Sequence, residues 1–282
     1  MFNYSTKALL LQNPCYGQLL FGYSKFSQMI LRRLGNKSKI AEDIITYFPD
    51  HKIYVEPFFG AGGMFFNKRK AKYNIVNDLD CEVVNLFQVI QKDKIGFEEA
   101  VYKMPIHSGL LEYWKTNEEK DPIQKAIRFI LISNMTWMGI GDKIHLSLKN
   151  HKKPIFEALE KTEKLISDVQ FANYDFKEFI SSISFRNNEE KISTLIYCDP
   201  PYLGTNDNYS NSFTEQDSID LFDSLQATGC KFAMSEFDNE FILNQAKERG
   251  LNVIIIGERK NLKNRRTEIL ITNYEKQKGL FD

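Results

Sequence analysis

The sequence predicts an α/β protein in which a mostly parallel sheet of seven strands is flanked by helices. Apolar, β-prone runs alternate along the chain with helical patterns, which is typical of βαβ units. A glycine-rich turn at 60–63 follows the first predicted strand, and an Asp-Pro-Pro-Tyr turn at 199–202 follows a later one. Because ligands bind beyond the carboxyl ends of strands in open α/β sheets, both turns are expected at one ligand-binding edge.

The composition is that of an ordinary soluble globular protein. The chain has 282 residues, of which 43% are hydrophobic and 26% charged, and this size suits one large domain or a domain with an insertion. Its 37 basic and 37 acidic residues cancel, so any nucleic-acid surface must be a local patch. The four cysteines are far apart, which predicts reduced thiols in the cytoplasm and no zinc site. No apolar run has the length of a membrane span.

The chain begins with an extension, 1–28, that lacks a clear period and is expected to pack on the main domain. A basic turn at 35–37 follows. A glycine beside a lysine lets the backbone bring an ammonium close to a ligand, although a plain surface loop would also explain it. Apolar residues at helical spacing then predict a helix over 38–48.

Two predicted strands, 53–55 and 73–78, enclose the glycine-rich turn. Small residues there let the backbone approach a ligand, and Asp78, about 20 residues further on, is placed to bind ribose hydroxyls. A cofactor that contains a nucleoside is therefore predicted. A dinucleotide turn would need a third glycine where Phe65 stands, which disfavours a nicotinamide dehydrogenase. The loop also lacks the lysine and serine or threonine of a triphosphate site.

The pattern becomes mainly helical after a helix predicted over 82–91. Alternating polar residues at 143–149 predict a hairpin strand within this region. We interpret 92–165 as an inserted domain, and the catalytic domain is then formed by 1–91 together with 166–282.

The sheet is predicted to resume after the insertion. A polar stretch at 186–191 is expected to be a loop, and 204–212, rich in Asn, Asp, Ser and Gly, a mobile loop beside the site. The basic run 259–266 is either a solvated hairpin tip or a loop that contacts phosphates. The remaining strands are predicted at 169–176, 194–198, 231–235, 252–257 and 268–273, with helices at 215–227 and 239–249.

The predicted strand at 194–198 ends in Asp199, Pro200, Pro201 and Tyr202. Prolines have no N–H, so strand pairing must stop there. One acid, stiff backbone carbonyls and one aromatic ring remain at the end of the strand. A rigid turn with a capping acid would account for the same residue types, so the motif alone leaves both interpretations open.

Taken together, these motifs resemble the Dam-like DNA adenine methyltransferases. This resemblance implies the class I methyltransferase fold with an inserted, mainly helical DNA-recognition domain. It also implies S-adenosylmethionine as methyl donor and transfer to the exocyclic amino group of adenine in double-stranded DNA, with base flipping. The matching segments are the cofactor loop at 56–63, the catalytic motif at 199–202, and 35–37, Asp78, 175–176 and 268–274, in the order of that family.

The resemblance also implies roles for individual residues. Asp199 and the carbonyl of Pro200 would accept the hydrogens of the amino group, and Tyr202 would stack on the flipped base. Lys37 would lie near the carboxylate of the cofactor, whereas Arg33 stands where the family usually has an aromatic contact. The cofactor-binding residues are predicted to be Arg33, Lys37, Glu56, Phe59, Gly60, Gly62, Asp78, Asp175, Phe176 and Asp199. Predicted DNA contacts are Asn134, Trp137, Lys149, Lys152, Lys153, Arg259, Lys260, Arg265 and Arg266.

Two alternatives stay open on sequence grounds. The same fold could methylate a cytosine amine or an adenine in RNA, and the chain could be an inactive DNA-binding module. The acid at the start of the catalytic motif favours adenine by resemblance, and the intact motif with Lys37 disfavours an inactive site. The expected partners are double-stranded DNA and a cognate restriction endonuclease in a restriction-modification system, and no membrane.

Overall fold

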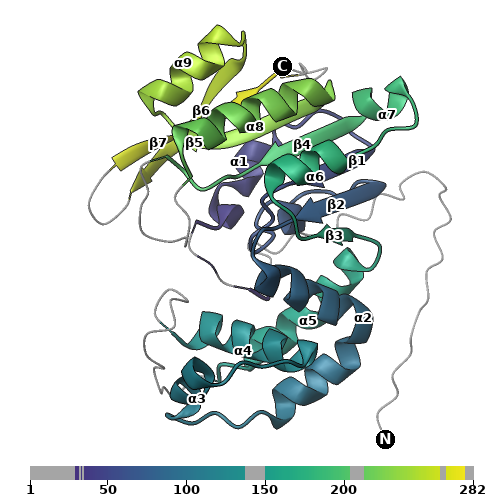
Figure 1. Ribbon diagram of the computed structural model, residues 1–282, viewed down its shortest axis with the longest axis vertical. Coiled ribbons are helices and arrows are strands. Elements are labelled where there is room, and N and C mark those ends of the chain that lie inside the picture. Colours follow the sequence, from purple (N-terminus) through teal and green to yellow (C-terminus); the bar gives the residue numbers. More distant parts are fainter. Residues whose placement is uncertain are drawn as a thin grey trace, which may run out of the picture.

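The computed structural model of the protein describes residues 29–31, 33, 35–136, 150–203, 213–260 and 265–276. Figure 1 shows a sheet with helices packed on it and a second group of helices below the sheet. The predictions made for 1–28, 143–149 and 204–212 fall outside the described residues.

The sheet has seven strands in the order β3-β2-β1-β4-β5-β7-β6. The pairs among β1 to β5 are parallel, whereas β7 is antiparallel to both β5 and β6. The predicted mostly parallel, seven-stranded sheet is therefore confirmed. The strands are β1 Ile53–Glu56, β2 Tyr73–Asn77, β3 Gln170–Ala172, β4 Thr194–Cys198, β5 Lys231–Phe237, β6 Asn252–Lys260 and β7 Arg265–Thr272.

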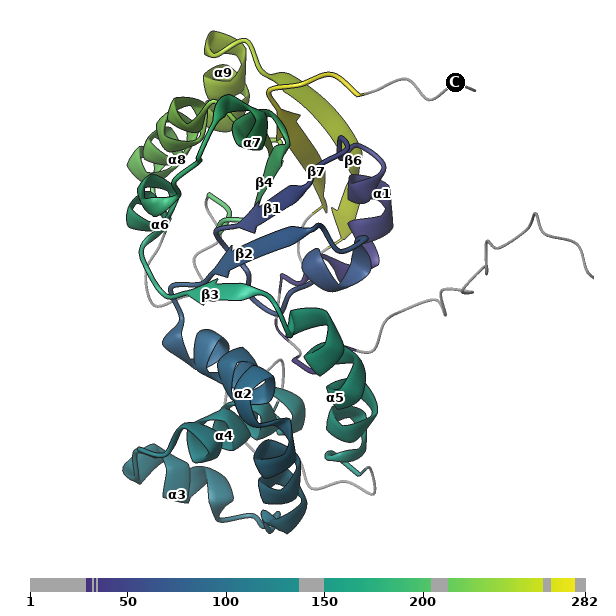
Figure 2. The same ribbon diagram turned by 90° about the vertical axis from the view of Figure 1, so that its right-hand side faces the viewer.

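Helices cover both faces of the sheet, and Figure 2 shows α6, α8 and α9 on one face and α1 on the other. Successive side chains of a strand point to opposite faces, so the central strand β4 feeds two separate cores. Leu195 and Tyr197 belong to the core under α1, and Ile196 belongs to the core under α6 and α8. The helices are α1 Ala41–Ile45, α6 Phe176–Ser182, α7 Asn188–Ile192, α8 Glu215–Thr228 and α9 Glu240–Glu248, with short 3₁₀ turns η1 Lys37–Lys39 and η2 Phe65–Asn67.

The second group of helices lies between β2 and β3 in the sequence and below the sheet in Figure 1. Its first helix starts at the carboxyl end of β2, where the Asp80 side chain accepts a hydrogen bond from the Glu82 N–H. This helix kinks at Asp93, whose backbone is not helical (φ −147°, ψ 65°). The buried side chains of the group join the core under α1, so the core is continuous between the two parts. The helices are α2 Cys81–Lys103, α3 Leu110–Thr116, α4 Pro122–Met135 and α5 Lys153–Ile166.

Several local predictions differ from the structure. The strand predicted over 169–176 is only β3, because the Asp175 side chain already caps α6 there, and the helix predicted over 82–91 continues through the kink at Asp93 to Lys103. The helix predicted over 38–48 is two short pieces, η1 and α1, because the chain turns between them at Ile40. The loop predicted over 186–191 contains α7, because the Asn187 side chain caps that helix by accepting from the Glu190 N–H. The last two strands are longer than predicted, since backbone pairing across their hairpin continues to Lys260 and Arg265. None of the described helices combines the length and the apolar character of a membrane span.

Candidate active site

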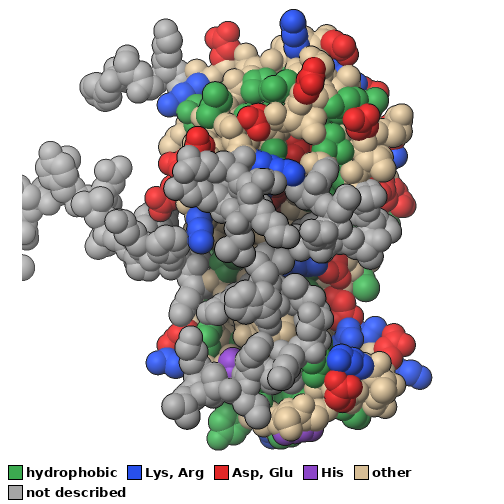
Figure 3. Space-filling view, turned by 90° about the vertical axis from the view of Figure 1, so that its left-hand side faces the viewer, with side chains coloured by type: hydrophobic (Ala, Val, Ile, Leu, Met, Phe, Trp, Pro, Cys, Tyr) green, Lys and Arg blue, Asp and Glu red, His purple; other side chains and the backbone are tan. Residues whose placement is uncertain are grey.

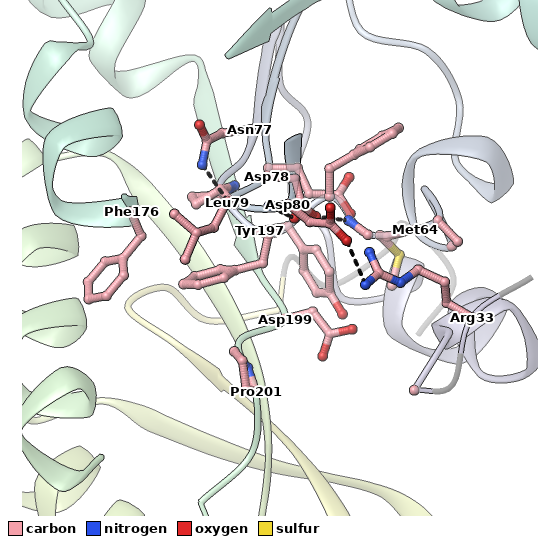
Figure 4. A pocket seen from close by; sticks show the side chains of 18 of the residues that line it. Arg33, Met64, Asn77, Asp78, Leu79, Asp80, Phe176, Tyr197, Asp199 and Pro201 are labelled. Carbon is pink, nitrogen blue, oxygen red and sulfur yellow. Dashed lines mark hydrogen bonds and ion pairs between the residues drawn. The ribbon is translucent and has the colours of Figure 1, made fainter. Parts of the chain in front are cut away.

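A pocket of about 620 Å³ opens at the carboxyl ends of β1, β2 and β4. Figure 4 shows side chains from the loops after all three strands pointing into the same space. The pocket has the size of a small-molecule site and lies at the edge of the sheet where α/β proteins bind ligands. Nine of the ten predicted cofactor residues line it: Arg33, Lys37, Glu56, Phe59, Gly60, Asp78, Asp175, Phe176 and Asp199. The tenth, Gly62, stands in the same loop behind the lining.

The loop after β1 depends on its glycines. Gly60 and Gly62 have positive φ values of 54° and 73°, which side-chain-bearing residues adopt at a cost. A Cβ atom on Gly63 would come within 2.2 Å of the Asn36 side-chain oxygen and 3.0 Å of the Lys37 backbone nitrogen. The glycine loop therefore packs directly against the turn that carries Lys37.

The acid after β2 is tied to the glycine loop. Asp78 accepts hydrogen bonds from the backbone N–H groups of Gly60 at 2.6 Å and of Asp80 at 2.9 Å. Burial raises the pKa of Asp78, and these two hydrogen bonds and the Arg33 charge oppose that effect. The Arg33 guanidinium lies 2.9 Å from the Asp80 carboxylate and 5.9 Å from the centre of the Phe129 ring on α4. Figure 4 shows the Arg33 and Asp80 pair at one side of the pocket.

The acid after β4 pairs with the lysine of η1. Lys37 Nζ lies 2.6 Å from Asp199 Oδ1, and the two side chains are 3% and 20% exposed. The same ammonium lies 3.5 Å from the buried carboxylate of Glu268 on β7. Lys37, predicted to lie near a cofactor carboxylate, thus contacts two carboxylates of the protein itself.

The tyrosine of the same motif is buried in this conformation. Its hydroxyl donates a hydrogen bond to Glu268, and its ring packs edge-on against Phe237 with ring centres 4.5 Å apart. Lys37 Nζ lies 4.4 Å from the centre of the Tyr202 ring. Pro200 is buried beside it and does not line the pocket, whereas Pro201 does. Stacking of Tyr202 on a base therefore requires a rearrangement of this ring.

A buried carboxyl lines the pocket, and a buried lysine that is not part of the lining lies near it. Glu56, 2% exposed, accepts a hydrogen bond from the Tyr54 hydroxyl at 2.8 Å. Burial raises the pKa of Glu56 well above its usual value. Burial also lowers the pKa of Lys68 to about 7, and its ammonium lies 3.8 Å from the centre of the Tyr54 ring. The tyrosine thus separates the carboxyl from the amine in the apolar interior.

The apolar wall of the pocket comes from the start of α6. Asp175 caps that helix by accepting from the Lys177 N–H at 2.9 Å, which places Phe176 in the wall. The Phe176 ring centre lies 5.6 Å from Phe58 and 5.9 Å from Phe213. Sequence reasoning did not select Phe58, Phe213 or Asp80. Phe58 lies inside the motif at 56–63 and could have been predicted from it. No local signal in the sequence places Phe213 in the pocket wall, because its position there depends on the tertiary fold.

The predicted DNA contacts have mixed surroundings. Lys152 Nζ donates to the backbone carbonyls of Tyr102 and Met104 at the end of α2, at 2.9 and 2.5 Å, whereas Lys153 pairs with Glu157 at 3.6 Å. The side-chain amide of Asn134 is buried without a hydrogen-bond partner among the described residues. The Arg266 guanidinium lies 5.3 Å from the centre of the Phe237 ring. Trp137, Lys149 and the side chains of Arg259, Lys260 and Arg265 lie outside the described residues.

The described surface carries both signs of charge. On the face in Figure 3, described Lys and Arg side chains are interspersed with Asp and Glu, in keeping with the zero formal net charge. Within the described parts of the chain, no cluster of three or more His, Cys, Asp or Glu side chains could hold a metal ion, and Cys81, Cys198 and Cys230 are free thiols.

The matching family model and the curated relatives point to one family. A family model described as "D12 class N6 adenine-specific DNA methyltransferase" matches residues 34–262. The DNA adenine methylase of Escherichia coli K12 is 24% identical over 70% of this chain and 75% of its own length. The DNA adenine methylase of Vibrio cholerae El Tor is 24% identical over 82% of this chain and 81% of its own length. Among solved structures, the rRNA methyltransferase aviRa of Streptomyces viridochromogenes matches with a TM-score of 0.39 and 11% identity, over 90% of this chain and 88% of that chain, a likeness too low to carry an argument.

Proposed function

This chain belongs to the D12 class N6 adenine-specific DNA methyltransferases, and we propose that its pocket brings S-adenosylmethionine and an adenine base together at Asp199. The protein is an enzyme that transfers a methyl group from S-adenosylmethionine to the exocyclic amino group of adenine in DNA. One observation carries the proposed site: the glycine loop, Asp78 and Asp199, on the ends of three different strands, line the same pocket.

The lining of the pocket fits a methyl donor that carries a nucleoside. Gly60 and Gly62 let the loop backbone approach the donor closely. Asp78, at the end of β2, is placed to accept hydrogen bonds from ribose hydroxyls. The rings of Phe58, Phe176 and Phe213 provide an apolar wall for a flat base. When bound, S-adenosylmethionine supplies an activated methyl group on a sulfonium.

Asp199 and the Pro200 carbonyl act on the nucleophile. The lone pair of the adenine amino group is delocalised into the ring, so the amine is a poor nucleophile. Two acceptors that bind its two hydrogens draw the nitrogen toward tetrahedral geometry and localise the lone pair. As the N–C bond forms and the C–S bond breaks, the nitrogen becomes acidic and its proton moves to the Asp199 carboxylate. Positioning and acceptor charge thus supply most of the catalysis.

The adenine must leave the duplex to reach this site. Enzymes that act on a base inside a duplex flip it out of the stack. Tyr202 is the aromatic ring next to the acceptors, and stacking on a base contributes about 1–3 kcal/mol per base. Because the Tyr202 ring is buried against Phe237 in this structure, we propose that base entry and a rotation of this ring occur together.

Nucleoside analysis of DNA after incubation with the purified enzyme and S-adenosylmethionine tests this proposal. Wild-type protein should produce N6-methyladenine, whereas Asp199→Asn should lower the rate by about 10²–10³-fold, the cost of losing one preorganised electrostatic partner. Asp223→Asn is the matched control, since that exposed carboxylate pairs with Arg249 on the surface, away from the pocket lining. Full activity of folded Asp199→Asn would exclude the proposed role of the acid.

Four finer assignments are proposals. The helical group between β2 and β3, predicted as 92–165, is proposed to recognise the target sequence, and the basic hairpin at 259–266 to contact DNA phosphates. Pairing with a restriction endonuclease is proposed on the resemblance alone and is tested by the DNA cleavage pattern of cells that lack the methyltransferase. We place the protein in the cytoplasm, where fractionation of cells should find it with the DNA.

A further inference from the structure

A buried carboxylate lies behind the proposed acceptor, on the other side of the lysine. Glu268 is on β7 and is 1% exposed. Its Oε1 lies 3.5 Å from Lys37 Nζ, while the same ammonium lies 2.6 Å from Asp199. The Tyr202 hydroxyl donates to the same oxygen of Glu268. Glu268 does not line the pocket, so it contacts two members of the site from behind.

The second carboxylate changes the charge of the site. A lysine that pairs with a single carboxylate forms a neutral pair, and the carboxylate then attracts positive charge more weakly. With both carboxylates ionised, Lys37, Asp199 and Glu268 together carry one net negative charge. Positive charge develops on the adenine nitrogen as the methyl group arrives, and a preorganised negative site stabilises it. Burial raises the pKa of the neighbouring Glu236 to about 8, so that group adds little charge at pH 7.

Glu268 also fixes the aromatic ring. The hydrogen bond from the Tyr202 hydroxyl to Glu268 and the contacts of the ring with Phe237 and Lys37 orient this side chain. Two prolines precede Tyr202 and stiffen the backbone between it and Asp199. The hydrogen bond to Glu268 is therefore a polar contact that links the orientation of the ring to the Lys37 and Asp199 pair.

We propose that Glu268 is a positioning residue for methyl transfer, which shares the charge of Lys37 so that Asp199 stays a strong acceptor and which keeps the Tyr202 hydroxyl anchored while the ring turns toward the entering base. This inference rests on the proposed role of Asp199. It assigns Glu268 no contact with the base or with S-adenosylmethionine, so its loss should change the rate of the chemical step more than binding.

Glu268→Gln tests this role, because it preserves the size of the side chain and an oxygen that accepts from Tyr202 while it removes the charge. We expect kcat for DNA methylation to fall about 10- to 100-fold, as for loss of a charged hydrogen-bonded partner. The KM for S-adenosylmethionine should change by less than about twofold. Tyr202→Phe, which removes only the hydroxyl, should also lower kcat. The two losses should be less than additive in the double variant, because the neutral glutamine already weakens the charge-assisted hydrogen bond that the Tyr202 hydroxyl makes.

Glu189→Gln is the control for the same chemical change at the surface, since that carboxylate is 79% exposed and pairs only loosely with Lys52 at 3.4 Å. Wild-type kcat in folded Glu268→Gln overturns the inference, and so does a parallel loss of S-adenosylmethionine affinity and kcat, which would indicate a collapsed pocket. If Glu268→Gln does not fold, wild-type kcat in Tyr202→Phe overturns it instead. Full activity of Asp199→Asn refutes the proposed role of Asp199, whereas an impaired Asp199→Asn beside a fully active Glu268→Gln refutes this inference alone.

Discussion

A buried carboxyl on β5 should make the stability of this protein fall as the pH rises toward neutrality. Glu236 is 1% exposed, and its Oε1 accepts a hydrogen bond from the Phe237 N–H at 2.8 Å. Burial raises the pKa of Glu236 from its usual 4.5 to about 8, with the Asp199 charge acting in the same direction and Lys37 opposing it. The folded protein therefore holds a proton at neutral pH that the unfolded chain releases.

The sign and the size of the effect follow from proton linkage. The contribution of this group is fully present below its unfolded pKa of about 4.5 and is lost as the pH rises through about 8. Within this window the free energy of unfolding falls by up to about 1.4 kcal/mol per pH unit. A glutamine at position 236 does not titrate. The free energy of unfolding of Glu236→Gln, relative to that of wild type, should therefore rise by about 2–3 kcal/mol between pH 5 and pH 7. A packing effect of the amide would shift this difference equally at every pH.

Urea unfolding followed by circular dichroism at pH 5, 6 and 7 measures this difference. The comparison across pH cancels the constant effect of the amide, so only the titration of Glu236 remains. Glu189→Gln is the control for the same chemical change at an exposed carboxylate. If the difference between Glu236→Gln and wild type is the same at all three pH values, the carboxyl is ionised in the folded state and the reasoning is wrong.

Two further substitutions test the loop and the insertion. Gly63→Ala places a methyl group against the Asn36 side chain and the Lys37 backbone, so the affinity for S-adenosylmethionine, measured by calorimetry, should fall at least about tenfold. Gly250→Ala is the control, because its methyl group meets no atom within 4 Å. Its φ of 64° makes this substitution strained as well, but it should leave the affinity unchanged. Lys152→Met removes the ammonium that binds the last carbonyls of α2 and should lower the free energy of unfolding by about 1 kcal/mol, more than Lys153→Met does. Equal destabilisation by these two lysine variants would contradict the capping role of Lys152.

The parts of the site that follow strands could be predicted from the sequence. Gly60, Asp78 and Asp199 each stand at the end of an apolar run, and parallel strands bring such ends to one edge of a sheet. Local signals in the chain therefore contain both their positions and their common side. A different signal, the change to a mainly helical pattern after residue 91, predicted the insertion over 92–165.

The groups behind the site could not be predicted in this way. Glu268 was selected only as part of a terminal motif, and its contact with Lys37 spans most of the chain, from η1 to β7. Whether a glutamate within a strand is buried depends on the neighbouring strands. Glu268 lies on β7, which pairs with β5 on one side and β6 on the other. Likewise, a lysine in a basic cluster has no local mark that distinguishes Lys152, bound to α2 carbonyls, from Lys153 on the surface.

The kink in α2 has a consequence for exchanging recognition segments between relatives. A graft cut at residue 92 would divide α2 next to Asp93 and separate Phe87 from Phe97, although both are fully buried in one core. The grafted half of α2 would then present apolar side chains that pack against the core of the relative it came from and not against the core of this protein. Chimeras joined at Asp80 and Asp168, which lie outside α2 and α5, would keep both helices intact and place the junctions at polar residues.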